Sequence, residues 1–278
     1  MNARTRGALA IALATGALGA CSTVLGIDAD RHVASAPDSG SDAGLGGWWC
    51  ENNPLPDASP GLLKLAMFVN DVSSASVQNS FAGNPIVGAS VHACSTLDIA
   101  CANPIASATS NDAGIALITV PSRFSGYYEL MASGFTSAVA SRTPQLSDES
   151  GQQGMADLAL IAAGGGLAGV TADPTLATSI VSVLDCNENP ATNMLIEVGA
   201  PGPKEKLVYL ADSLPSASAT QTDATGSAII YNVPPGTLRL TASFASDHRP
   251  LRAISTLARV GWVTFVQIRL DQSTHPPI

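Results

Sequence analysis

The sequence predicts an all-β protein in which two tandem antiparallel β-sandwiches follow a signal peptide and a disordered tether. Three observations predict this class: a duplicated module, apolar residues that recur with a period of two, and turn residues between short runs. The chain has 278 residues, 46% of them apolar and 5% aromatic. It is long enough for two domains, and we expect cores of Ala, Val, Leu and Ile.

The first segment, residues 1–20, has the layout of a secretory signal peptide. Arg4 and Arg6 precede an apolar stretch that is too short to be a permanent anchor and ends in small residues. The Leu-Gly-Ala-Cys run that ends at Cys21 resembles the lipobox of bacterial lipoproteins, which implies cleavage before Cys21 and its acylation. Several acyl chains hold a protein stably on a membrane. Ser22 in place of Asp implies, by the same resemblance, the outer membrane.

Residues 21–47 predict a flexible tether, because they are rich in Gly, Ser and Ala and acidic, without a lasting apolar period. Thirteen Lys plus Arg against 22 Asp plus Glu give a net charge of −9. Removal of Arg4 and Arg6 with the signal peptide makes the mature chain more acidic still. This charge argues against nucleic acid and anionic lipid headgroups as partners.

The rest of the chain is a duplicated module, with three blocks that recur in one order. The blocks are Asn84–Val91 over Asn189–Ile196, Ser107–Pro121 over Ser218–Pro234, and Gly126–Ser133 over Gly236–Ser243. We expect module 1 at residues 48–162 and module 2, with a short N-terminal linker, at residues 163–278. Within each copy apolar residues alternate with polar ones between Asp, Gly and Pro turns, which is typical of about seven half-buried strands.

These motifs carry a family resemblance. The order Asn-Pro-x-x-Gly-Ala-x-Val, Asp-Ala-Gly, Val-Pro and Gly-Tyr-Tyr-Glu-Leu in residues 84–130 resembles the carboxypeptidase regulatory-like modules. The resemblance implies transthyretin-like (prealbumin-like), Ig-like sandwiches, related to the B-type repeats of collagen adhesins. With its lipobox, linker and cysteines, the whole chain resembles predicted myxobacterial lipoproteins that carry two such domains. It implies an accessory, adhesive or spacing role.

Four cysteines remain once Cys21 is acylated, and export favours two disulfides. We expect Cys94 with Cys101 across a hairpin, and Cys50 with Cys186 between the modules. Zinc is the alternative, but no Cys-x-x-Cys pair is present. We therefore expect no metal and no cofactor.

A glycine run at residues 164–169 matches a dinucleotide-binding fingerprint after a strand-like segment, residues 157–161. The helix that this chemistry needs is replaced by β-branched residues and Pro174, so a linker or short helical connection is the better interpretation. Catalytic spacings for a serine or metal hydrolase are absent, although His92 lies on an expected strand.

Two further sets of residues are candidates for a functional role. The related adhesin repeats form a Lys-to-Asn/Asp amide beside a buried acid, and this resemblance implies Lys64, Glu129 and Asp157 as the candidate set. A solvated lysine on a strand is the better interpretation of Lys64. The large aromatics include two adjacent pairs, whose exposed members would form a binding platform for a glycan or a protein. These pairs are Trp48, Trp49, Tyr127 and Tyr128. Packing is the more common role of aromatic side chains on strands.

The sequence thus predicts a non-enzymatic, membrane-anchored adhesion, interaction or scaffold protein of the cell envelope. The partner is an unknown protein or polysaccharide. A carbohydrate-binding module that uses the exposed aromatics is the first alternative, and a cryptic hydrolase is the second.

Overall fold

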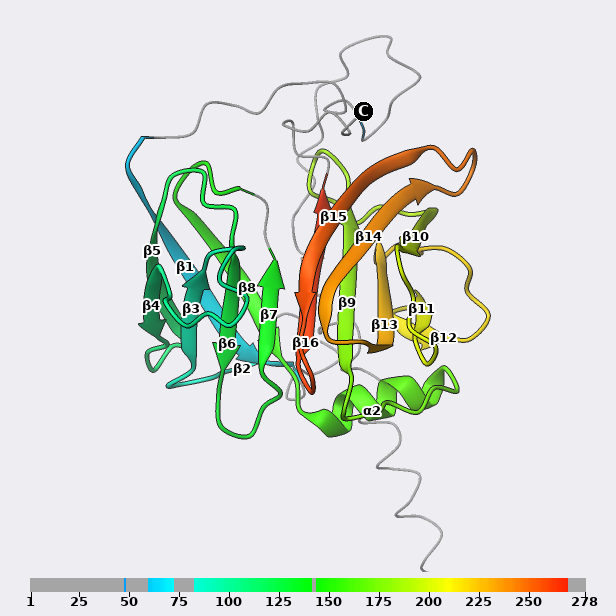
Figure 1. The fold of residues 1–278 in the computed structure, drawn as a ribbon, viewed down its shortest axis with the longest axis horizontal. Coiled ribbons are helices and arrows are strands. Elements are labelled where there is room, and N and C mark those ends of the chain that lie inside the picture. The colour runs from blue at the N-terminus through cyan, green and yellow to red at the C-terminus, as the bar shows by residue number, and fades with distance from the viewer. Residues whose placement is uncertain (1–47, 49–59, 73–82, 142–143, 270–278) are drawn as a thin grey trace, which may run out of the picture.

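The computed structural model describes residue 48 and residues 60–72, 83–141 and 144–269 (Figure 1). These residues form sixteen strands and one helix, which confirms the predicted all-β sandwich class. The predicted signal peptide, the acylated Cys21 and the tether lie outside the described residues. No helix in the described ranges has the length and apolar character of a membrane span.

The first half of the fold has eight strands. They are β1 (Leu62–Asp71), β2 (Asn84–Pro85), β3 (Ser90–Cys94), β4 (Ala106–Thr109), β5 (Ile115–Pro121), β6 (Tyr127–Met131), β7 (Ala138–Ser141) and β8 (Glu149–Met155). In β1 every second residue from Leu63 to Val69 is buried, as the period of two predicts. β1 pairs with β5 antiparallel and with β8 parallel, while β6 pairs with β3 and β7.

The second half repeats this pairing pattern. Its strands are β9 (Ala177–Leu184), β10 (Met194–Val198), β11 (Lys206–Ala211), β12 (Leu214–Ser216), β13 (Ser227–Val233), β14 (Gly236–Phe244), β15 (Pro250–Ala258) and β16 (Val263–Arg269). β9 pairs with β13 antiparallel and with β16 parallel, and β14 pairs with β10 and β15. The duplicated sequence is therefore also a duplicated topology.

The duplicated turn before β5 and β13 shows why the blocks recur. Gly114 and Gly226 both have positive φ, and their carbonyls accept hydrogen bonds at 2.8 Å from Val69 and Val183. A Cβ atom at either glycine would lie 2.7 Å from the carbonyl oxygen of that same valine. Only glycine combines this backbone conformation with such a close approach.

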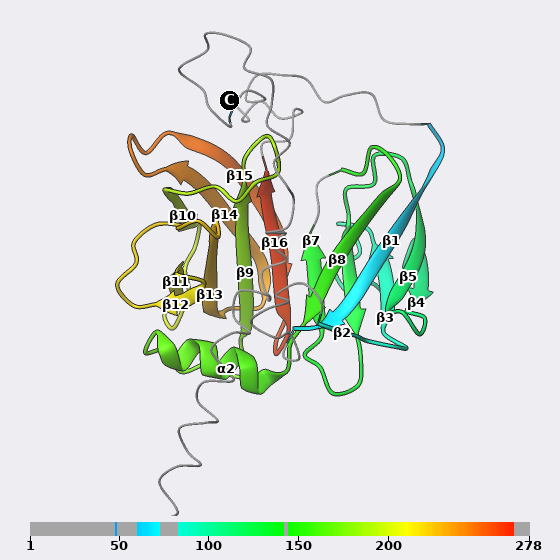
Figure 2. The ribbon, with the colours of Figure 1, turned by 180° about the vertical axis from the view of Figure 1, so that it is seen from behind.

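One nine-stranded sheet runs through both halves, in the order β12-β11-β13-β9-β16-β7-β6-β3-β4. β16 makes the join, because it lies parallel to β9 on one side and to β7 on the other. Figures 1 and 2 show β16 and β7 side by side in the middle of the molecule. The two sandwiches therefore share one continuous sheet and are not connected by a linker alone.

The two smaller sheets cover opposite faces of this shared sheet. The β1-β5-β8 layer packs over the first half, around the buried residues of β1, β3, β6 and β7. The β10-β14-β15 layer packs over the second half on the other face, as the view from behind shows (Figure 2). Phe265 of β16 contacts the first core and also a third core that lies under the helix.

The helix, α2 (Leu158–Leu167), corrects one sequence expectation. Residues 157–161 were expected to be strand-like, but Asp157 caps the helix by accepting a hydrogen bond from the Leu160 amide at 2.7 Å. The Leu-Ala-Leu-Ile-Ala-Ala run that follows consists largely of good helix formers. Gly164 and Gly165 are buried within this helix, in agreement with a short helical connection. The expected module boundary at residue 162 falls inside α2 and stays a prediction.

Candidate interaction site at the module junction

The loop between Cys94 and Cys101, which we call the disulfide loop, is closed by the predicted bond. The two Cα atoms are 5.3 Å apart, so this pairing is confirmed. Cys186 is also disulfide-bonded. Its predicted partner, Cys50, lies outside the described residues, and that pairing stays a prediction.

Asp98 organises the disulfide loop from within. Its carboxylate accepts hydrogen bonds from the amides of Asn103 at 2.7 Å and Ala102 at 3.0 Å. These bonds favour the charged form, so they lower the pKa of Asp98 below its ordinary value. Its carbonyl oxygen accepts from the Cys101 amide at 3.0 Å and from the Tyr127 hydroxyl. The tip of the loop therefore holds one conformation.

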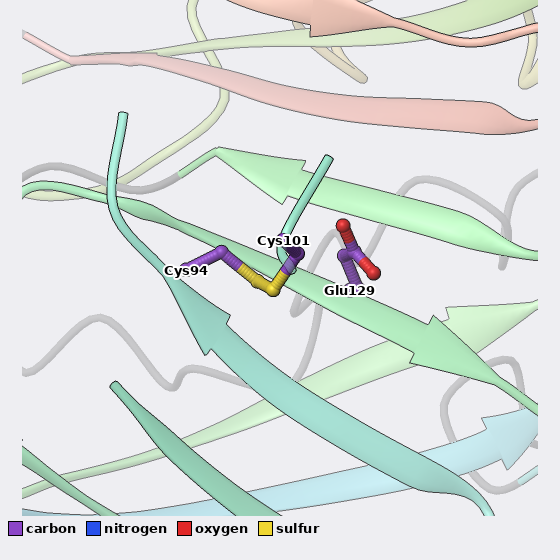
Figure 3. Close-up of side chains that lie close together, drawn as sticks. All are labelled: Cys94, Cys101 and Glu129. Atoms are coloured by element: carbon purple, nitrogen blue, oxygen red, sulfur yellow. A yellow bond between two sulfur atoms is a disulfide. The ribbon is translucent and has the colours of Figure 1, made fainter. Parts of the chain in front are cut away.

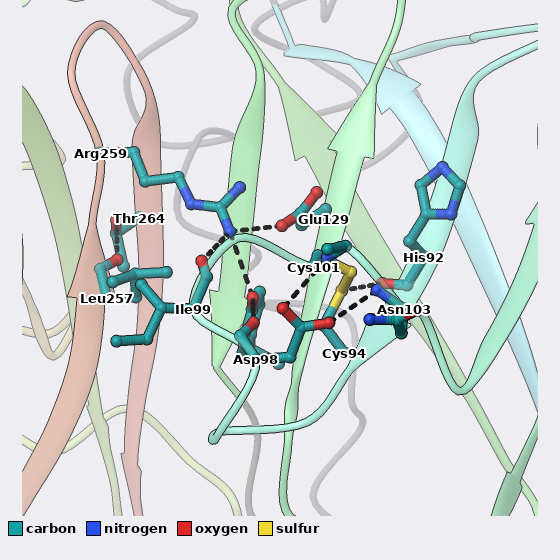
Figure 4. Close-up of polar contacts among 12 residues, drawn as sticks. His92, Cys94, Asp98, Ile99, Cys101, Asn103, Glu129, Leu257, Arg259 and Thr264 are labelled. Carbon is teal, nitrogen blue, oxygen red and sulfur yellow. Dashed lines mark hydrogen bonds and ion pairs between the residues drawn. A yellow bond between two sulfur atoms is a disulfide. The ribbon is translucent and has the colours of Figure 1, made fainter.

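Arg259, at the end of β15, ties the disulfide loop of the first half to the second half (Figure 4). Its Nη2 atom lies 2.5 Å from Oε1 of Glu129 and donates to the Ile99 carbonyl and, at 3.1 Å, to the Tyr127 hydroxyl. The guanidinium carbon lies 4.8 Å from the ring centroid of Trp262. The side chains of Arg259 and Glu129 are 18% and 7% exposed, so this ion pair is largely shielded from water.

Large aliphatic side chains project from this fixed loop into solvent. Leu97 is 93% exposed, Ile99 is 61% exposed and Ile105, just beyond the loop, is 47% exposed. A cluster of exposed aliphatic groups on a rigid support is typical of a protein-binding surface.

A metal site does not form around the loop in its oxidised state. Ligand atoms of Cys94, Cys101 and Glu129 lie within 4.8 Å of one another. The two sulfur atoms are bonded to each other (Figure 3), which removes them as thiolate ligands. Glu129 already faces the positive charge of Arg259.

The expectation that Tyr127 and Tyr128 belong to an exposed aromatic platform is wrong, because both side chains are buried. Tyr127 and Tyr128 are 5% and 0% exposed. The β1-β5-β8 layer covers Tyr128 on one face of β6, and Cys101, Leu257 and Trp262 pack over the cluster that contains Tyr127. Tyr128 packs on Phe124 with ring centroids 5.4 Å apart. Burial also raises the pKa of the Tyr127 hydroxyl above its ordinary value.

The tryptophan pair gives no platform in the described part of the chain. Trp48 is half-buried against the core of the second half, edge-on to Phe244 at 5.0 Å between centroids. Trp49 lies outside the described residues. The observed role of Trp48 is thus packing.

The expected amide cross-link set is not brought together. Lys64 lies on the exposed face of β1, and Asp157 follows β8, whose Met155 pairs with Asp71 seven residues along β1. At about 3.3 Å per residue this separates Lys64 from Asp157 by about 20 Å. Glu129 sits on the other sheet and pairs with Arg259. The amide candidate is therefore not formed, because the bond needs all three groups in contact. Lys64 is exposed, as the solvated-lysine interpretation expects.

His92 has the hydrogen bonds of a structural histidine. Its Nε2 and Nδ1 atoms lie 2.7 and 2.8 Å from the hydroxyl oxygens of Ser90 and Ser107. Glu129 lies opposite His92 on the neighbouring strand, but its carboxylate forms an ion pair with Arg259. Figure 4 shows the His92 imidazole pointing away from Glu129. An acid that orients the histidine, as a serine hydrolase requires, is not in place in the described residues.

Sequence reasoning missed Arg259, Asp98 and Leu97. Aliphatic residues inside a short Cys-to-Cys loop are a signal that would have identified Leu97. Arg259 carries no such signal, because its partners Glu129 and Ile99 are 130 and 160 residues away.

Comparison with known proteins adds no family. No protein-family model and no curated protein matches the chain. Among solved structures it is similar to a cohesin–X-dockerin complex of Acetivibrio cellulolyticus at 10% identity and a TM-score of 0.25, over 34% of this chain and 56% of that one. The chain thus spans about half of that relative's length.

Two pilins are also similar. The minor pilin GBS52 of Streptococcus agalactiae has 14% identity and a TM-score of 0.24, over 78% of this chain and 98% of its own. A mutant form of the shaft pilin spaA of Lactobacillus rhamnosus GG has 10% identity and a TM-score of 0.24, over 76% and 98%. TM-scores of 0.24 and 0.25 are too low to support a structural assignment. The assignment of the fold rests on the strand pairing described above.

Proposed function

We propose that this protein is a non-enzymatic, lipid-anchored interaction protein of a bacterial cell envelope. Acyl chains on Cys21 hold it on the outer membrane, residues 21–47 give reach, and the two fused sandwiches present the disulfide loop to a protein partner. The lipobox and signal-like N-terminus support the anchor, and the family resemblance supports the adhesive role.

The observation that carries the proposal is the 93% exposure of Leu97 at the tip of a loop that is fixed at both ends. Binding costs conformational entropy when loops and side chains become ordered. Here the disulfide, the Asp98 hydrogen bonds and the Arg259 contact have already ordered the loop. A partner that buries Leu97 and Ile99 gains apolar contact without that cost.

The test compares the same charge substitution at two largely exposed leucines. Leu97→Asp places a carboxylate on the disulfide loop, and Leu117→Asp places one on β5, where Leu117 is 71% exposed. Tagged proteins are cross-linked in intact cells, purified and quantified by mass spectrometry. We expect partners of the wild type to be lost with Leu97→Asp and kept with Leu117→Asp. Equal recovery with both variants would overturn the role of the loop.

The anchor is tested separately. Cys21→Ser should move the protein from the membrane fraction to the soluble envelope fraction, and intact mass should show acyl chains on wild type only. Membrane recovery that is unchanged in Cys21→Ser would overturn lipid anchoring while leaving the loop hypothesis standing.

A further inference from the structure

β4 forms one end of the nine-stranded sheet, and its outer edge pairs with no strand in the described part of the chain. Its partner is β3, from Ala106 beside Ala93 to Thr109 beside Ser90. Figures 1 and 2 show β4 at the outer side of the first half, away from the junction at β16. At the opposite end of the sheet, β12 contains Pro215, which has no amide hydrogen, and α2 packs against it. Among the described residues, neither kind of protection is present at β4.

The main-chain groups of β4 alternate between β3 and solvent. The Ser110 amide, directly after β4, donates to the Ala89 carbonyl at 2.9 Å. Alternate residues of an antiparallel strand direct their amide and carbonyl groups to the same side, so the two alanines of β4 face β3 while Ser107 and Thr109 face away from it. The side chains of Ser107 and Thr109 are exposed, and those of the alanines pack against the first core. The edge therefore presents the amides and carbonyls of Ser107 and Thr109 to solvent.

Such an edge is a template for an added strand, because the spacing of its amides and carbonyls matches that of another extended chain. Exposed aliphatic side chains lie at both ends of it. Ile105, directly before β4, is 47% exposed. Val87, which is 57% exposed, lies at the far end, where the Gly88 amide donates to the Ser110 carbonyl at 3.0 Å. An added strand gains main-chain hydrogen bonds along β4 and apolar contacts at its ends.

The charge near this edge favours a basic occupant. Residues 86–121, which include β3, β4 and β5, contain two Asp and no Lys or Arg. Asp112 is exposed in the turn after β4, and Asp98 precedes β4 in the disulfide loop, where main-chain hydrogen bonds lower its pKa. Arg259, which lies near Asp98, is already paired with Glu129. A second copy that paired antiparallel through its own β4 would bring these acids towards each other, and like charges across strands are unfavourable.

We propose that the β4 edge binds an extended segment of a partner protein by strand addition, with basic residues at the ends of that segment. The inference rests on the proposed function in that the partner is a protein, and it names the chemistry of the partner. Residues opposite each other in a sheet point to the same face. The partner residues that bond to Ser107 and Thr109 therefore lie on the exposed face and are polar. The residues between them lie over the alanines of β4 and are apolar.

A capped peptide with this pattern, Lys-Thr-Val-Thr-Val-Thr-Lys, tests the proposal on the full chain. Binding is followed by the NMR signals of the Ser107 and Thr109 amides, at about millimolar peptide because a short strand binds weakly. N-methylation of the threonine amides should weaken binding at least about tenfold, because these amides bond to β4. N-methylation of the valine amides should leave binding unchanged, because they face solvent. A peptide with Glu at both ends should bind more weakly. Absence of binding by the first peptide, or equal binding after methylation of its threonines, would overturn the inference.

Variants of β4 locate the binding. Ser107→Pro removes an amide that faces away from β3, and proline is compatible with an edge strand at such a position. Ser107→Ala is the matched control, because it keeps the amide and removes only the hydroxyl that contacts His92. We expect at least about tenfold weaker binding in Ser107→Pro and no change in Ser107→Ala. Unchanged binding in a Ser107→Pro protein with a wild-type circular dichroism spectrum would overturn the inference. The methylated peptides need no protein variant, so they decide the question if Ser107→Pro does not fold.

Two further measurements separate this inference from its rivals. A dimer in sedimentation that is lost in Ser107→Pro would identify a second copy as the occupant and overturn the basic partner. Leu97→Asp should bind the peptide as wild type does, because Leu97 lies outside β4. Loss of cellular partners in Leu97→Asp without any peptide binding would overturn strand addition and leave the proposed function standing. Peptide binding as expected, with all cellular partners kept in Leu97→Asp, would overturn the role of the disulfide loop and support strand addition.

Discussion

Phe265 on β16 lies directly beside Ala140 on β7, in parallel register across the boundary between the two halves. The same phenylalanine contacts the core of the first half and the core under α2. The halves are thus joined by a strand pair and by a shared side chain, and each contributes to the other's stability.

Phe265→Ala should lower the free energy of unfolding by about 3 kcal/mol, because it removes packing from two cores at once. The matched control, Leu117→Ala, truncates a leucine that is 71% exposed and should change it by less than about 0.5 kcal/mol. Urea unfolding followed by circular dichroism measures both. Equal losses would contradict the joint role of Phe265.

Arg259→Met should cost about 3–5 kcal/mol, because it leaves the Glu129 carboxylate buried without its cation. Glu129→Gln in the same chain removes the unpaired charge and should recover a large part of that loss. A double-mutant cycle by urea unfolding measures the coupling. Additive effects of the two substitutions would show that the ion pair does not couple the halves.

Gly226→Ala should destabilise the protein by more than 1 kcal/mol, because φ is +64° and the new Cβ would lie 2.7 Å from the Val183 carbonyl oxygen. Gly166→Ala, in α2 with nothing within 4 Å, should instead stabilise it by up to about 1 kcal/mol. Opposite shifts in the thermal midpoint are expected. A stabilising Gly226→Ala would contradict the close approach.

Replacing Cys94 and Cys101 together by Ala should cost about 2.5 kcal/mol, the chain entropy of a loop whose ends are seven residues apart. Hydrogen exchange should rise at the amides of Ala102 and Asn103, which follow the loop directly and donate to the Asp98 carboxylate within it. The matched control is the same experiment on Leu97→Ala, which leaves the disulfide intact. Unchanged exchange in the double variant would show that the loop is ordered without its disulfide.

Asp173 should titrate near pH 2 in carbon-13 NMR, against an ordinary value of 3.8. Because its pKa is lower in the folded state, its favourable contribution is complete above about pH 4 and is lost as pH falls towards 2. Thr175→Val and Lys204→Met should each raise the pKa of Asp173, because the side chains of Thr175 and Lys204 donate hydrogen bonds that lower it. A midpoint at 3.8 in wild type would contradict the observed hydrogen bonds.

Much of the fold follows from local sequence. Strands β5 and β14 follow from a two-residue alternation. The turns at Gly114 and Gly226 follow from the Asp-Ala-Gly and Asp-Ala-Thr-Gly patterns of the two copies. The Cys94–Cys101 bond follows from short spacing. Residues 157–161 were misjudged, because an apolar run that suits a strand also suits a capped helix.

The sequence by itself determined that the chain is β-rich and duplicated, because side-chain period and turn chemistry act between near neighbours. Only the tertiary structure decided that β16 joins the halves, that Arg259 reaches Glu129, and that Tyr127 and Tyr128 are buried. These features depend on which strand edges and faces meet. The first two contacts join residues more than a hundred positions apart, and the alternation within a single strand carries no information about its distant neighbour.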